Sequence, residues 1–117
     1  MDPESVWLNI VVSLAIKPHD VHTVPRNARA PLWFYAYIQR GRLYVENSTA
    51  REPSTKISAR REIIYEDFDI VYSYYHRWLK GEKNIRHEVS RFSRNTAYIL
   101  GLISKFENIE PPWHMID

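Results

Sequence analysis

Two segments rich in aromatic and aliphatic residues, 32–39 and 42–47, flank the dipeptide Arg40-Gly41 and predict a β-hairpin. With that dipeptide as a two-residue turn, the opposing pairs are Gln39 with Arg42, Ile38 with Leu43, Tyr37 with Tyr44 and Ala36 with Val45. Residues opposite each other in an antiparallel pair share a face. A slip of one residue would mix the aliphatic and aromatic sets, so the pattern also predicts the register.

The two faces of this hairpin differ in composition. One face is aliphatic and is the expected core side, with Leu32, Phe34, Ala36, Ile38, Leu43 and Val45. The other face is aromatic, with Trp33, Tyr35, Tyr37 and Tyr44, and Arg42 shares the parity of Tyr44. Whatever covers the aliphatic face, the aromatic face points away from it.

The remainder of the first half is interpreted mainly as strands. Residues 6–16 place Leu8, Ile10, Val12, Leu14 and Ile16 at every second position, which predicts a half-buried strand. Residues 17–31 contain three prolines and two histidines and predict a long loop. Residues 56–64 form a further candidate strand, with Ile57, Ala59 and Ile63 on one side.

From residue 66 onward the apolar spacing becomes helical. Phe68, Val71, Tyr75 and Trp78 form one stripe, and Gly81 is the expected end of that helix. A second helical stretch covers about 85–106, with its apolar side formed by Val89, Phe92, Ile99, Leu102 or Ile103, and Phe106. Ser93 or Asn95 could divide it as the N-cap of a separate helix that begins near Thr96.

These patterns predict the α+β class, with a three- to four-stranded antiparallel sheet in the N-terminal half packed on two or three C-terminal helices. The length of 117 residues suits a single domain, with 1–64 mainly strands and 65–110 helical. The chain has no cysteine, which excludes a disulfide scaffold and a zinc site with cysteine ligands.

The formal net charge of +2 conceals two basic segments. Residues 51–61 contain four basic residues and one acidic residue, and residues 77–94 contain six basic and two acidic residues. Clustered cations are the electrostatic footprint of a nucleic-acid partner, because phosphates supply most of the binding free energy. The plainer interpretation is solvated charge, on the outer side of an edge strand for residues 51–61 and on a helix face for residues 77–94.

The segment 86–106 resembles the second half of a helix-turn-helix motif, in which Arg94, Asn95 and Tyr98 would point toward bases or phosphates. The segment lacks about two residues of the usual turn, including its glycine. The alternative is a continuous or kinked amphipathic helix whose arginines are solvated.

The leading interpretation is a small non-catalytic protein that binds DNA or RNA through a basic helical flank, without a cofactor. Its expected binding residues are Arg60, Arg61, Arg77, Lys80, Lys83, Arg86, Arg91, Arg94, Asn95 and Tyr98. The first alternative is a protein-interaction module or homodimer that uses the aromatic face of Trp33, Tyr35, Tyr37 and Tyr44. These rings could also stack on bases, but the favoured interpretation is that they pack on one another or beneath the loop 17–31.

The second alternative is a hydrolase that depends on histidine or a metal. His19, Asp20 and His22 are weak candidate metal ligands in the predicted loop, and His76 and His87 lie near acidic residues. No phosphate-binding loop or nucleophile motif accompanies them, so an enzyme is the less favoured interpretation. The apolar stretch 6–16 follows acidic residues and is too short to span a bilayer, so we expect a cytoplasmic protein without a membrane partner.

Overall fold

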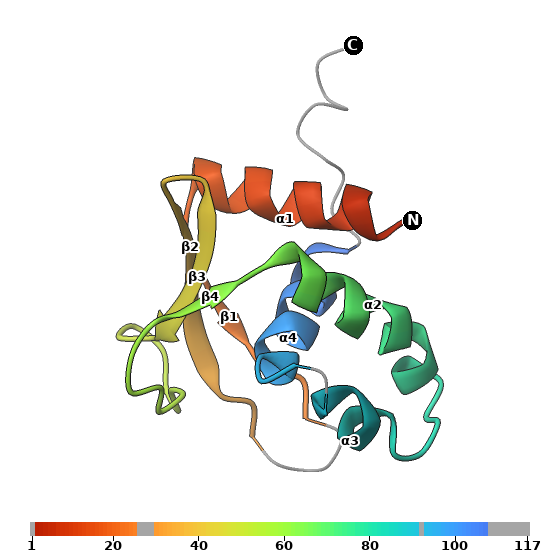
Figure 1. Cartoon of the computed structure of the whole chain (residues 1–117). Helices are drawn as coiled ribbons and strands as arrows, with labels where there is room; N and C mark the ends of the chain where they lie inside the picture. The colour runs from red at the N-terminus through yellow and green to blue at the C-terminus, as the bar shows by residue number, and fades with distance from the viewer. Residues whose placement is uncertain (1, 26–29, 92, 108–117) are drawn as a thin grey trace.

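The computed structural model describes residues 2–25, 30–91 and 93–107, and Figure 1 shows how its elements are arranged. In chain order they are α1 (Pro3–Ile16), β1 (His19–His22), β2 (Trp33–Gln39), β3 (Arg42–Asn47), β4 (Arg61–Ile63), α2 (Tyr65–Leu79), α3 (Ile85–Ser90) and α4 (Thr96–Phe106). The four strands form one antiparallel sheet in the order β1-β2-β3-β4. The predicted α+β class is confirmed.

The central hairpin has the predicted register. Gln39 pairs with Arg42, and each of the other predicted pairs is also present. Arg40 and Gly41 both have positive φ, of 52° and 75°, as a type I′ turn requires of its two central residues. This turn matches the twist of the flanking strands, and it projects Arg40 from the end of the hairpin.

The prediction of a strand over residues 6–16 is wrong, because these residues belong to α1. Apolar residues occur there both at every second position and at helical spacing, and Val6, Ile10 and Leu14 form the buried stripe. Two helix-start signals in the sequence explain why this segment is a helix and not a strand. The Asp2 carboxylate accepts a hydrogen bond from the Ser5 amide at 2.9 Å, and Pro3 occupies the first helical position.

Two further boundaries differ from the sequence prediction. β1 lies within the predicted loop 17–31, of which residues 26–29 lie outside the described part of the chain. Within the predicted strand 56–64, the strand in the structure is β4. The segment before β4 is held by hydrogen bonds to the side chain of Asn47 instead. Asn47 Nδ2 donates to the Ile57 carbonyl, and Asn47 Oδ1 accepts from the Ile57 amide and the Thr55 hydroxyl.

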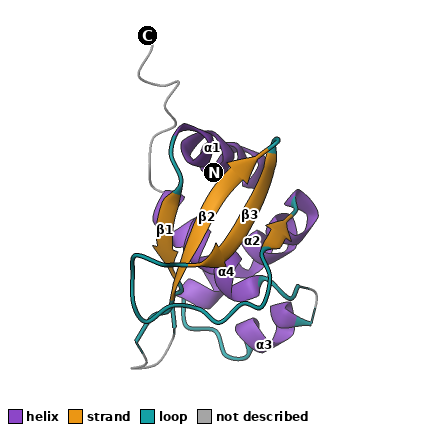
Figure 2. Ribbon diagram, turned by 90° about the vertical axis from the view of Figure 1, so that its left-hand side faces the viewer, coloured by secondary structure: helices purple, strands orange, loops and turns teal. Residues whose placement is uncertain are grey.

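The helices cover one face of the sheet, and in Figure 2 they lie behind β2 and β3. The core between these layers includes Phe34, Val45, Phe68 and Ile99, each with no exposed surface. The aliphatic side of the hairpin therefore faces the helices as predicted, except that Leu32 is 41% exposed.

The predicted stripe of α2 is also confirmed. Phe68, Val71, Tyr75 and Trp78 are buried, and Gly81 follows the helix with a φ of 82°. The second helical stretch is divided into α3 and α4, one of the alternatives that the sequence left open, and α4 begins at Thr96. Phe92 and residues 108–110, which the sequence prediction included, lie outside the described residues.

Candidate functional site

The face of the sheet opposite the helices is turned toward the viewer in Figure 2. The burial pattern of β2 and β3 places the aromatic side chains of the hairpin on this outer face. Three tyrosines, here called the tyrosine row, follow one another across β2 and β3: Tyr35, Tyr37 and Tyr44. The ring centroids of Tyr35 and Tyr37 are 5.6 Å apart, and those of Tyr37 and Tyr44 are 5.8 Å apart. All three rings are half-buried, so each keeps surface available to solvent.

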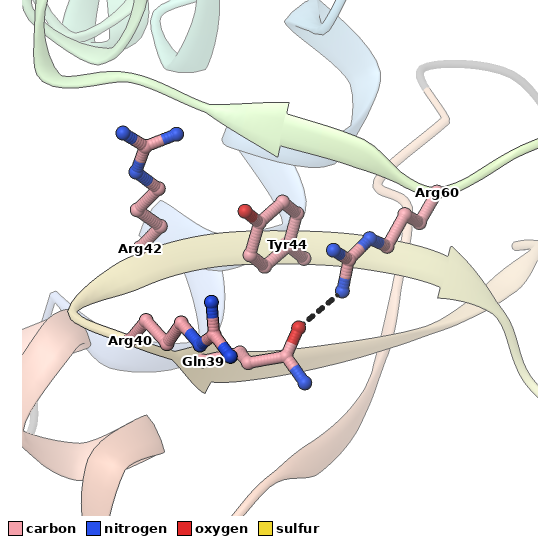
Figure 3. Close-up of a pocket in the computed structure, with 5 residues that line it drawn as sticks. All are labelled: Gln39, Arg40, Arg42, Tyr44 and Arg60. Carbon is pink, nitrogen blue, oxygen red and sulfur yellow. Dashed lines mark hydrogen bonds between the residues drawn. The ribbon is translucent and has the colours of Figure 1, made fainter.

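A concavity of about 580 Å³ lies at the turn end of this row. Its lining, here called the arginine pocket, consists of Gln39, Arg40, Arg42, Tyr44 and Arg60. Figure 3 shows the Tyr44 ring between the side chains of Arg42 and Arg60. The hairpin supplies four of the five residues, and the segment before β4 supplies Arg60. Arg42 is also 3.7 Å from Glu62, and the Arg42 side chain is 65% exposed.

Arg60 is held over the tyrosine row by several contacts. Its guanidinium carbon is 4.0 Å from the centroid of the Tyr44 ring, within the range of a cation–π interaction. Arg60 also donates hydrogen bonds to the Tyr37 hydroxyl and to Gln39 Oε1. The hydrogen bond to Tyr37 raises the pKa of Arg60 above its ordinary value. The Tyr37 hydroxyl in turn donates to Glu46 at 3.3 Å.

Trp33 lies at the other end of the same face and is also half-buried. Its ring is flanked by the His22 ring, at 5.1 Å between centroids, and by the Arg51 guanidinium, at 5.2 Å from the centroid. The main chain of Trp33 bonds to Pro53 and Thr55, so the segment after β3 lies against this end of β2. The four predicted aromatic residues therefore share a face but have different surroundings.

The two predicted nucleic-acid-binding residues near β4 lie on opposite faces of the sheet. Arg60 is on the outer face, whereas the Arg61 guanidinium is 5.6 Å from the centroid of the Tyr98 ring and donates to the Arg94 carbonyl. A recess of about 220 Å³ adjoins Arg61, Glu62, Arg94 and Asn95. Asn95 is only 8% exposed, and the Tyr98 ring packs against Phe34.

The cations of the basic helical flank have different surroundings. Arg77 forms an ion pair with Glu82 and lies over the Tyr74 ring, which offsets its charge. Arg86 donates to the Val24 carbonyl at 3.4 Å. The remaining cations of the flank are exposed, and they are Lys80, Lys83, Arg91 and Arg94.

The resemblance to a helix-turn-helix does not extend to the surface of α4. A recognition helix needs an exposed face that can enter the major groove. In α4, the buried residues are Thr96, Ile99, Leu100, Gly101, Leu102, Ile103 and Phe106, and only Ser104 and Lys105 are exposed. The helix lies between the sheet and α2 (Figure 1), so its burial leaves no such face.

The four histidines in the described part of the chain are not assembled into one site. His19 packs on Phe106, at 5.6 Å between ring centroids, and burial together with Lys105 and Lys17 lowers its pKa. Asp20 accepts from the Ser48 hydroxyl, and His22 contacts Trp33 on the outer face. Among the residues that the structure describes, no three histidine, cysteine, aspartate or glutamate side chains lie close enough together to hold a metal ion. His76 of α2 lies 3.3 Å from Glu107, and His87 belongs to α3.

Sequence reasoning missed Gln39 and Arg40 as members of the pocket and did not assign Arg42 to a binding site. The available signal was the turn itself, because a two-residue hairpin turn brings the residues on both of its sides together. The result is a cationic concavity beside flat aromatic rings. Such a site can hold an anionic group and a planar group at the same time.

In the described part of the chain, no helix is long and apolar enough to cross a membrane. No protein-family model matches this chain, and the comparisons with curated proteins and with solved structures found no match either.

Proposed function

We propose that this protein binds single-stranded nucleic acid through the outer face of its sheet. The observation that carries the proposal is the placement of Arg60 over Tyr44, inside a pocket that also contains Arg40 and Arg42. Arginine neutralises phosphates, and tyrosine rings stack on unpaired bases for about 1–3 kcal/mol per base. The tyrosine row and the arginine pocket supply both on one face.

The preference for a single strand follows from the shape of the face. Bases in a duplex are stacked on each other, so only a single strand can place a base against the ring of Tyr35 or Tyr37. Recognition of a duplex groove requires a protruding element, and α4 offers no exposed face for that purpose. The sheet face is therefore favoured over the basic helical flank as the binding surface.

The proposal is tested by fluorescence anisotropy with labelled 12-nucleotide oligo(U) and oligo(dT) at 50 mM salt. With three arginines contacting phosphates, the logarithm of the binding constant should fall with the logarithm of the salt concentration with a slope of about −2. Arg42→Glu should weaken binding strongly and reduce the slope. The matched control is Lys83→Glu, an exposed cation in the basic helical flank.

Absence of binding at 50 mM salt would contradict the proposal. A loss of binding on Lys83→Glu but not on Arg42→Glu would instead place the contact on the helical flank. Equal affinity for a duplex of the same length would contradict single-strand recognition. A dimer of the free protein that Tyr35→Glu abolishes would mean that a second copy of the chain occupies the tyrosine row.

A further inference from the structure

The first helix, α1, has no polar face along its last two turns. Val6, Ile10 and Leu14 are buried against the rest of the protein. Among the residues on the opposite side of the helix, Leu8 is 49% exposed and Ile16 is 70% exposed. A surface helix of a globular protein normally carries polar residues on its outward side, and a helix that is apolar all round is normally buried.

The outward residues of α1 form one continuous stripe at helical spacing: Leu8, Val11, Val12, Ala15 and Ile16. Leu8 and Ile16 lie four residues on either side of Val12. If two copies of α1 cross in antiparallel orientation at Val12, Leu8 of each copy meets Ile16 of the other. This stripe is therefore complementary to itself about a two-fold axis, the most common symmetry of soluble oligomers.

The charges at the ends of α1 favour the same arrangement. Asp2 and Glu4 are exposed at its N-terminal end, and Lys17 is exposed at its C-terminal end. An antiparallel crossing brings each acidic end toward the basic end of the other copy, and it also opposes the two helix dipoles. A membrane surface fits less well, because interfacial helices carry lysine and arginine and Pro3–Ile16 contains neither.

We infer that α1 is a homodimer interface in which two copies of this chain pack their outward stripes antiparallel about Val12. The inference does not depend on nucleic-acid binding, because the outer face of the sheet is a different surface. One pair of helices of about 21 Å buries less than the roughly 1,600 Å² of a standard interface. The small buried area argues for a weak and reversible dimer.

Sedimentation equilibrium from about 1 to 500 μM should show a reversible dimer. Ile16→Glu and Leu8→Glu should each abolish it, while Leu79→Glu, at a 54% exposed residue of α2, should leave it unchanged. Lys17→Glu should weaken the dimer several-fold, and adding Glu4→Lys should restore it. Circular dichroism of each variant checks that the fold is retained.

Cross-linking gives a sharper test, because the chain contains no cysteine. At a two-fold axis, Val12→Cys should form a disulfide-linked dimer on treatment with diamide, and Leu79→Cys should not. A monomer throughout the concentration range would overturn the inference. A dimer that survives Ile16→Glu, or binding of the monomer to phosphatidylcholine vesicles that Leu8→Glu abolishes, would also overturn it.

Discussion

The side-chain amide of Asn9 donates a hydrogen bond of 2.9 Å to the main-chain carbonyl of Phe106, joining residues that are 97 positions apart. Asn9 is fully buried in α1, and Phe106 is the last residue of α4. The final carbonyls of a helix have no partner within it, so this bond satisfies a group that burial would otherwise make costly.

Asn9→Ala should therefore lower the free energy of unfolding by about 1–3 kcal/mol, because it leaves a buried acceptor without its donor. Urea unfolding at pH 7 measures the change. Ser13→Ala, at a half-buried residue of the same helix, is the control and should stay within about 0.5 kcal/mol of the parent. If Asn9→Ala left the free energy of unfolding unchanged, the Phe106 carbonyl would have another hydrogen-bond donor in the variant.

Asn9 also illustrates why the first element was predicted wrongly. In the alternating pattern it falls on the polar side of a strand, and only the helix places it between α1 and the end of α4. Its partner belongs to the opposite end of the chain, which no local pattern can reveal. The hairpin was predictable because its two strands are neighbours and each constrains the register of the other.

The same reasoning explains which parts of the candidate site could be predicted from the sequence and which could not. The aromatic face follows from alternation within β2 and β3, so sequence alone predicts that Tyr35, Tyr37 and Tyr44 share it. Arg60 comes after a segment that hydrogen bonds with the Asn47 side chain hold in place. Side-chain hydrogen bonds of this kind leave no periodic pattern in the sequence. The pairing of Arg60 with Tyr44 could therefore not be predicted.

Gly101 marks the closest approach of α4 to β1. A Cβ atom at this position would lie 2.6 Å from the His22 carbonyl oxygen and 3.2 Å from the Phe34 ring. Gly101→Ala should therefore destabilise the protein by about 1–3 kcal/mol, even though alanine favours a helix by about 1 kcal/mol. Lys105→Ala, at an exposed residue of α4, should stay within about 0.5 kcal/mol of the parent in the same thermal unfolding experiment. Equal stabilities of the two variants would contradict the close packing.

Tyr72 should make the stability fall in alkaline solution. Burial, aided by the charge of Glu107, raises the pKa of Tyr72 from 10.0 to about 12. A phenol that ionises less readily in the folded protein than in the unfolded chain stabilises the fold fully below pH 10. That contribution is lost as the pH rises through 12. The loss should be on the order of 1 kcal/mol at pH 11.

Urea unfolding of the parent and of Tyr72→Phe at pH 9, 10 and 11 isolates this contribution. Phenylalanine cannot ionise, so the parent should lose stability relative to the variant as the pH rises. Tyr74→Phe, at a half-buried residue of the same helix, should follow the parent. A constant difference between the parent and Tyr72→Phe would contradict the raised pKa.

Asn47 connects the stability of the loop to the proposed binding site. Its side chain holds Thr55 and Ile57 with three hydrogen bonds, and this segment leads to Arg60. Asn47→Ala should weaken oligo(U) binding several-fold by releasing Arg60 from Tyr44. Asn47→Asp keeps the acceptor but loses the donor to Ile57, so its effect should be intermediate. Unchanged binding by both variants would mean that Arg60 is positioned without this loop.

The last prediction separates the geometry of Arg60 from its charge. Lysine retains the positive charge but lacks the planar fork that lies over Tyr44 while donating to Tyr37 and Gln39. If the stacked guanidinium presents a phosphate contact, Arg60→Lys should lose nearly as much oligo(U) affinity as Arg60→Ala. The salt dependence should differ, because only Arg60→Ala removes a charge and reduces the slope, by about 0.7. Parental affinity in Arg60→Lys would show that charge alone suffices at this position.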